Sequence, residues 1–173
     1  MTSVRYTSRQ RVLDTLDRRE PDRIPFDLGS SIETGITVQA YQALIDFLGL
    51  AEDDAVKALL AAGIIGVFIA RGATFSAEIG GCQAECGSAS GMSAAGLVTL
   101  AGGSLEQAIA AASMALQSSL GMICDPIANR VEAPCLGKNT MAAANALSAA
   151  NMALAGFDPL IPFDEVVVAM DQV

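Results

Sequence analysis

The stretch that decides the fold is GGCQAECG, residues 80–87, which holds two of the four cysteines among glycines. Glycine has no Cβ, so backbone here can come close to whatever the sulfurs hold. The other two thiols, Cys124 and Cys135, lie in a second segment that is rich in turn-forming residues. The first question is therefore whether these sulfurs bind a metal centre or fill a core.

The cysteine spacing leaves both answers open. Cys86 is separated from Cys82 by three residues, Cys124 follows Cys82 by 42, and Cys135 follows Cys124 by 11. This is not the paired C-x2-C pattern of a structural zinc site, and a free cysteine in an alanine-rich core behaves as a small hydrophobe. In contrast, soft thiolates on loops beside glycine and proline suit an iron-sulfur cluster.

Length and composition indicate a soluble globular chain. With 173 residues it can bury a sizeable core without disulfides. The N-terminus is polar and lacks the pattern of a signal peptide, and the longest apolar run, residues 58–70, has 13 residues. A membrane span needs roughly 18. We therefore expect a cytoplasmic protein that does not enter the membrane and whose thiols are reduced.

Charge is distributed unevenly along the chain. Residues 1–30 hold six of the ten basic side chains, which leaves four basic against fourteen acidic side chains afterwards. So acidic a chain repels phosphate backbones, which argues against nucleic acid and anionic membrane surfaces. There is no histidine, the commonest general base and metal ligand. Any metal chemistry must therefore use sulfur and carboxylate.

The first fifty residues predict a helix-strand-helix appendage. Thr7 and Gln10 form a capping box for the first helix, and Pro25 favours an extended segment over residues 22–29. Thr37 caps a second helix, closed by Gly49. Its apolar stripe is Val38, Tyr41, Leu44, Ile45 and Leu48. Composition changes at the acidic residues 51–54, which predicts one unit at 1–54 and a second at 55–173.

The second unit predicts a mostly α fold, a compact helical domain whose small side chains let helices approach closely. Residues 55–70 could form a buried helix or a short strand, and we favour the helix. After a turn at 80–87, residues 89–100 favour a further helix. Ser104 and Gln107 form a capping box for a helix that reaches about Leu120. The two prolines predict a loop over residues 124–135. An alanine-rich helix capped by Asn139 or Thr140 then ends near Gly156, and Asp164 caps a last helix through Met170.

Two segments of the N-terminal part carry a resemblance to a known superfamily. They are TSRQRVLDTLDRREPDRIPFDLGSSIETGI, residues 7–36, and AYQALIDFLGL, residues 40–50. They resemble the start of the uroporphyrinogen-decarboxylase-like superfamily, which includes corrinoid-dependent methyltransferases. That superfamily folds as a barrel of about 250 residues, which this chain cannot complete. The resemblance implies one alternative function, a corrinoid or porphyrinogen binder.

A second resemblance covers about two-thirds of the chain. Its motifs are GATFSAEIGGCQAECGSASGMSAAGL, GGSLEQAIAAASMAL, LGMICDPIANRVEAPCLGKN, AAANALSAANMAL and FDEVVVAM. In this order they resemble the C-terminal part of the α chain of iron-sulfur-dependent L-serine dehydratase. The resemblance implies a lyase, an L-serine ammonia-lyase that converts L-serine to pyruvate and ammonia without pyridoxal phosphate.

The resemblance also implies which residues hold the cofactor. A [4Fe-4S] cluster would be bound by Cys82, Cys124 and Cys135, and the iron without a cysteine would act as a Lewis acid at the substrate hydroxyl. Cys86 lies outside this trio and is expected to be a packing thiol. Lys138 is expected to be an exposed lysine near a helix cap.

Polar residues beside the ligands are Gln83, Glu85, Asp125 and Asn139. They could orient the cysteines or the substrate. Asp125 could instead form a turn before Pro126, and Asn139 a helix cap. No residue of this chain is assigned as the base that removes the α-proton.

The expected partners are L-serine and either a β chain or further copies of this chain. The alternative to a lyase, besides the corrinoid or porphyrinogen binder, is a non-catalytic iron-sulfur or structural protein descended from the same family.

Overall fold

The computed structural model describes residues 38–127, 130 and 132–173, together with scattered positions between 7 and 19. The chain divides into two compact units, Met1–Val38 and Gln39–Val173. In the first unit the backbone N–H of Thr7 donates to Gln10 Oε1 over 3.0 Å and that of Gln10 donates to Thr7 Oγ1 over 3.2 Å, which confirms the predicted capping box. The expected strand at 22–29 and the Thr37 cap lie outside the described residues.

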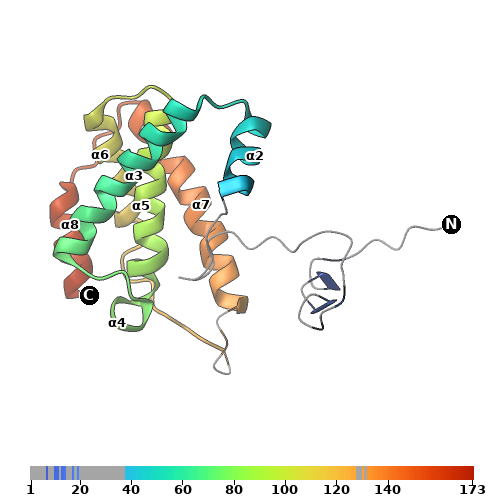
Figure 1. Ribbon diagram of the computed structural model, residues 1–173. Coiled ribbons are helices and arrows are strands. Elements are labelled where there is room, and N and C mark those ends of the chain that lie inside the picture. The colour runs from blue at the N-terminus through green and yellow to red at the C-terminus, as the bar shows by residue number, and fades with distance from the viewer. Residues whose placement is uncertain are drawn as a thin grey trace. The chain divides into compact units, whose positions relative to one another are not determined.

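The second unit is built from helices, as predicted (Figure 1). In chain order they are α2 (Val38–Leu48), α3 (Glu52–Gly72), α4 (Ala77–Cys82), the π-helix η1 (Gln83–Gly87), α5 (Ser88–Leu100), α6 (Leu105–Gln117), α7 (Glu132–Leu154) and α8 (Phe163–Gln172). Whether 1–54 and 55–173 act as separate domains stays a prediction.

Helix α5 is the centre of the bundle, because it packs against α3, α6 and α7 (Figure 1). Two glycines on α5 permit this close packing. A Cβ at Gly91 would lie 3.3 Å from the carbonyl oxygen of Ala112 on α6, and one at Gly96 would lie 3.2 Å from that of Ala58 on α3. The prediction that small side chains bring the helices close is therefore confirmed.

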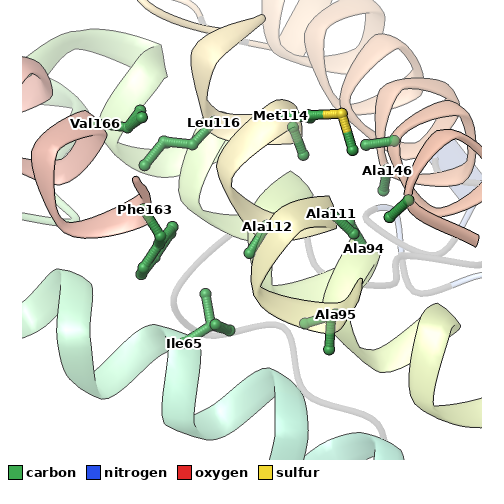
Figure 2. Packing of buried hydrophobic residues seen from close by; sticks show 14 of the residues in the cluster. Ile65, Ala94, Ala95, Ala111, Ala112, Met114, Leu116, Ala146, Phe163 and Val166 are labelled. Carbon is green, nitrogen blue, oxygen red and sulfur yellow. The ribbon is translucent and has the colours of Figure 1, made fainter. Parts of the chain in front are cut away.

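The core of the bundle, called the alanine core below, combines these small residues with a few larger ones. Figure 2 shows Ile65 of α3, Ala112 of α6 and Phe163 of α8 around one interior. The fully buried larger side chains include Ile69, Val98, Leu116 and Val166. The core alanines come from three helices: Ala94, Ala95, Ala108, Ala111, Ala112, Ala115, Ala146, Ala149, Ala150 and Ala153. Burial of apolar area is the main stabilising term here.

Helix α6 begins as predicted. Ser104 Oγ accepts from the backbone N–H of Gln107 over 3.2 Å, and Gln107 Oε1 accepts from that of Ser104 over 2.9 Å. The predicted cap at Asp164 is wrong, since Pro162 caps α8 and Asp164 lies in the first turn. Proline suits this place because it has no N–H that would need a partner.

The prediction of a loop over residues 124–135 is wrong at its end. Helix α7 begins at Glu132, so Pro134 and Cys135 lie in its first turn, and neither Asn139 nor Thr140 is a cap. A proline is tolerated in the first turn, where its missing N–H would have no helical partner. The predicted end near Gly156 is confirmed, because α7 ends at Leu154.

The prediction of a turn at 80–87 is also wrong. The segment is helical apart from one kink at Gly81, where φ is 74° and ψ is 179°. Helix α4 leads into the kink and η1 follows it directly. Only one of the glycines leaves the helical region, so the chain bends without leaving the bundle.

Among the described helices, α3 is long and apolar enough to cross a membrane by length and composition alone. Of its most apolar 18-residue window, 28% is buried inside the fold. The absence of a membrane partner therefore stays a prediction.

Candidate metal centre

The kink at Gly81 brings the two cysteine-bearing segments together. A Cβ at this residue would lie 2.7 Å from the carbonyl oxygen of Met122 and 3.4 Å from Cα of Ile123. Next to it, the backbone N–H of Gln83 donates to the Met122 carbonyl over 2.9 Å. The glycine therefore admits the backbone that carries Cys124.

Gln83 anchors the same segment from inside the fold. Its side chain is buried, its Oε1 accepts from the backbone N–H of Gly121 over 2.8 Å, and its Nε2 donates to the carbonyl of Met170 over 3.3 Å. It thereby joins η1 to the end of α8 and to residues 121–122. Gln83 is thus a structural anchor for the segment that leads to Cys124.

Lys138 connects three parts of the site. Its Nζ donates to the carbonyl of Ile123 over 2.7 Å, contacts the carboxylate of Asp125, and lies 3.7 Å from Cys82 Sγ. Ile123 and Asp125 flank Cys124, so the ammonium holds that residue from both sides. Only 16% of the lysine side chain is exposed. The prediction of an exposed lysine near a helix cap is therefore wrong.

The first two turns of α7 present Cys135 and Asn139. The side-chain amide of Asn139 donates to the Cys135 carbonyl over 2.9 Å, and its Oδ1 lies 3.9 Å from Cys86 Sγ. Asn139 lies inside the helix, so of its two predicted roles the cap is excluded. It links Cys86 on η1 to Cys135 on α7.

Cys82, Cys86, Cys124 and Cys135 are called the thiol cluster below. Cys82 and Cys86 are fully buried with Ala142, and Cys124 packs against them. The sulfurs of Cys82 and Cys86 and a carboxylate oxygen of Glu85 lie within 4.8 Å of one another. Cys135 is close enough for its charge to act on Cys82 and Cys86.

The protonation of the thiols follows from burial. Burial raises the pKa of Cys82 to about 12, against the opposing positive charge of Lys138. Burial, and then the charge of Glu85, also raises the pKa of Cys86 and Cys135. Because thiolates bind metals and thiols do not, metal binding here would release protons.

Lys138 remains charged at this site. Burial lowers its pKa, but the hydrogen bond to Asp125 and the interaction with Cys82 raise it by more, so its pKa lies above the usual value. A fixed positive charge beside several sulfurs favours their thiolate forms. The donor set, soft sulfurs with a carboxylate and a nearby cation, fits a metal cluster.

Sequence reasoning missed the contacts of one member of this arrangement, Lys138. Lys138 lies three residues after Cys135 and so on the same side of α7. This spacing is informative only if α7 begins at Glu132. The prolines predicted a loop there instead. Cys86 is fully buried beside Cys82, and its expected role as a packing thiol outside the trio stays a prediction.

An apolar groove of about 1160 Å³ lies between α3, α6 and α8. It is lined by residues such as Ile64, Phe68, Ile109 and Phe157, and by none of the four cysteines. The groove is therefore separate from the thiol cluster.

A helical unit with such a group of thiols fits the class of metal-binding helical domains. Comparison with known proteins shows to which family of proteins the chain belongs. The family model described as Serine dehydratase alpha chain matches residues 33–173. The chain therefore belongs to the serine dehydratase alpha chain family.

The relatives are named as L-serine dehydratases or as alpha chains of that enzyme. The protein of Bacillus subtilis (strain 168) named Probable L-serine dehydratase, alpha chain, is 45% identical over 136 residues, which cover 79% of this chain and 45% of the relative. The L-serine dehydratase alpha chain of Peptoniphilus asaccharolyticus is 53% identical over 109 residues, 63% of this chain and 37% of the relative. L-serine dehydratase 1 of Escherichia coli (strain K12) is 42% identical over 112 residues, 64% of this chain and 25% of the relative. The chain spans less than half the length of these three relatives.

Proposed function

We propose that this chain is the cluster-bearing part of an iron-sulfur-dependent L-serine dehydratase, which converts L-serine to pyruvate and ammonia. The observation that carries the proposal is the position of Lys138, which ties the Cys124 segment to Cys82 from the helix that bears Cys135. Family membership supports the same activity, since the relatives are named L-serine dehydratases.

Cys82, Cys124 and Cys135 would hold a [4Fe-4S] cluster in this proposal. Three thiolates would leave one iron without a cysteine. When bound, such an iron supplies Lewis acidity toward the hydroxyl group of L-serine. Sulfur ligands fit this group better than they fit a hard cation such as Mg²⁺, which prefers oxygen.

The chain's own residues would prepare the site. Lys138 offsets the negative charge of the thiolates and fixes both neighbours of Cys124. Gln83 holds residues 121–122, and Asn139 aligns the first turns of α7 with η1. Glu85 stands beside the sulfurs, where its carboxylate could accept a hydrogen bond from the ammonium group of L-serine.

The overall reaction is an elimination followed by hydrolysis. A base removes the α-proton, the β-hydroxyl leaves with a proton as water, and the carbon–carbon double bond of aminoacrylate forms. Aminoacrylate tautomerises to an imine, which water hydrolyses to pyruvate and ammonia. None of the described side chains is assigned as the base. No pyridoxal phosphate takes part in this proposal.

The partner and location follow from the same proposal. The name alpha chain, which the Bacillus and Peptoniphilus relatives carry, supports a β chain or a comparable subunit as partner. A cluster of reduced thiols suits the cytoplasm. The acidic net charge of −9 supports the absence of a nucleic-acid partner.

One observation favours a second function, that of a non-catalytic iron-sulfur protein. The chain spans only 45% of its Bacillus relative, so groups needed for turnover could lie in the remainder. In that case the chain would bind the cluster without acting on L-serine. The corrinoid or porphyrinogen binder stays a prediction that the described residues do not test.

Anaerobic reconstitution with ferrous iron and sulfide tests the proposal. We expect iron and sulfide to bind to the wild-type chain, to be lost in Cys124→Ser, and to be retained in Cys86→Ser, the matched control from the same cluster. Full iron and sulfide content in Cys124→Ser would overturn the ligand assignment.

Pyruvate formation separates the two functions. The reconstituted chain is assayed with L-serine, first alone and then with a co-expressed β chain. Pyruvate in either assay supports the dehydratase. A stable cluster with no pyruvate in both assays identifies the non-catalytic protein instead.

A further inference from the structure

The side of α3 that faces away from the bundle is an apolar strip exposed to solvent. The strip consists of Val56, Leu60, Gly63 and Val67. Leu60 is 67% exposed, and a Cβ at Gly63 would meet no atom within 4 Å. A helix that is apolar on all sides is normally covered on all sides. We therefore expect a partner to cover the outer strip of α3.

The inner side of the same helix is already occupied. Ala58, Ile65 and Ile69 are buried, and α3 packs on α5. A membrane-spanning role would need these residues to leave the core. At one end of α3, moreover, Glu52, Asp53 and Asp54 would be repelled by anionic lipid. A protein partner therefore fits the outer strip better than a bilayer does.

The strip has the spacing of a helix-pairing seam. Its residues are separated by four, three and four positions, which is the alternation that two helices use when they pack along their length. Gly63 lies near the middle of α3, where it allows another helix to come close. With 21 residues, α3 is about 31 Å long at about 1.5 Å per residue.

Charge occurs only near the ends of α3, and the two ends differ. The first turn carries Glu52, Asp53 and Asp54, with Lys57 paired to Asp54 over 3.1 Å, whereas the last turn carries Arg71. An antiparallel copy of the same helix would therefore bring the acidic end against Arg71 and would also oppose the two helix dipoles favourably.

One register of an antiparallel helix pair gives every residue of the outer strip a partner on the second copy. In an antiparallel pair that sets Val56 against Val67 of the second copy, Leu60 meets Gly63 and Glu52 meets Arg71. The large leucine then fills the space above the glycine, on both sides of a two-fold axis. Such a surface is complementary to itself, as a symmetric dimer requires.

We propose that the outer strip of α3 is a dimerisation surface, on which α3 of a second copy of this chain packs antiparallel. Ile64 and Phe68, which line the apolar groove beside α3, extend the contact on one flank. This inference does not depend on the metal centre, because α3 contributes none of the cysteines.

The oligomeric state of the full chain tests the proposal, by light scattering after size exclusion and by sedimentation equilibrium. We expect the wild-type chain to be a dimer and Leu60→Glu to be a monomer, since two like charges would face an apolar seam. Leu147→Glu is the matched control, because Leu147 is 55% exposed on α7 and lies outside the strip. It should leave the dimer intact.

A charge swap tests the register. Arg71→Glu would set acidic groups against each other and should weaken the dimer at least tenfold, a loss of about 1.4 kcal/mol or more. The double variant Glu52→Arg/Arg71→Glu restores opposite charges and should recover most of that loss. Circular dichroism checks that each variant keeps its helical content.

Three outcomes would overturn the proposal. They are a wild-type chain that is monomeric over the whole concentration range, a dimer that Leu60→Glu leaves unchanged, and binding of the monomer to phosphatidylcholine vesicles that Leu60→Glu abolishes. The last result would assign the strip to a lipid surface. Failure of the charge swap to restore the dimer would overturn the antiparallel register.

Discussion

The alanine core and the thiol cluster occupy the same helical unit but are held together differently. In the core, side chains such as Leu116 and Ile69 pack by burial. Around the thiol cluster, by contrast, the buried apolar group in the described part of the chain is small, namely Cys82, Cys86 and Ala142, and polar contacts of residues such as Gln83 and Lys138 fix the geometry. Stability should therefore depend on the core, and metal affinity on a few individual bonds.

The largest effect on stability is expected for Leu116→Ala in the alanine core. The side chain is fully buried, so its truncation should lower the free energy of unfolding by about 2–5 kcal/mol through lost burial and a cavity. Urea denaturation followed by circular dichroism measures the loss. Leu147→Ala, on the surface of α7, is the control and should change stability by less than about 1 kcal/mol.

The next largest effect is expected for Gly81→Ala. A φ of 74° with a ψ of 179° is a conformation that essentially only glycine adopts and costs other residues about 1–3 kcal/mol, and here the added Cβ would also meet the Met122 carbonyl at 2.7 Å. We expect the chain to lose its capacity for iron in anaerobic reconstitution. Gly102→Ala has the same φ of 74° with no atom within 4 Å, so it is the control for a side chain at positive φ without the clash. Equal iron content in both variants would contradict this account of Gly81.

A smaller effect, confined to the thiol cluster, is expected for Lys138→Met. Loss of the contacts to Ile123 and Asp125 should free residues 121–125, while the alanine core stays intact. Groups that orient metal ligands typically contribute about 10–100-fold in affinity, so iron binding should weaken by that order.

Hydrogen exchange of the metal-free chain gives an independent readout for Lys138→Met. Amides of residues 121–125 should exchange faster in this variant and remain protected in Lys57→Met, whose lysine is exposed and pairs only along its own helix with Asp54. Unchanged protection in Lys138→Met would show that the lysine does not hold the segment.

The smallest effect is expected at the start of α6, away from both regions. Ser104→Ala removes the acceptor for the backbone N–H of Gln107 and should lower the free energy of unfolding by about 1 kcal/mol. Iron content should not change. Thermal unfolding and iron analysis on one sample measure both quantities, and a loss of iron would contradict the separation of core and thiol cluster.

Local signals in the sequence predicted much of the fold. The capping boxes at Thr7 and Ser104 have the expected bonds, because a cap depends on residues three positions apart. The helix around residues 55–70 and the one at 89–100 were also predicted, although both have little apolar periodicity, the second least of all.

The predictions were wrong where a residue type is compatible with more than one backbone conformation. Pro134 predicted a loop, but in the first turn of α7 it is compatible with the helix. The glycines of residues 80–87 predicted a turn, although only Gly81 leaves the helical region. Which use applies depends on tertiary neighbours, which no short window of sequence contains.

The site was harder to predict than the fold for the same reason. Lys138 is largely shielded from solvent because Ile123 and Asp125 lie beside it, and these contacts span 15 and 13 residues of chain. Nothing local to Lys138 distinguishes it from a solvent-exposed lysine. The ligand roles of Cys82, Cys124 and Cys135 stay a prediction that the geometry supports.

The π-helix η1 has a consequence for how the family's sequences can vary in length. Its bonds enclose one more residue than those of an α-helix, and each residue turns a helix by about 100°. Deletion of a single residue within Gln83–Gly87 would restore an α-helix and rotate Cys82 away from Cys124. Substitutions in this turn can therefore be tolerated where a one-residue deletion cannot, so gaps in related sequences should avoid it.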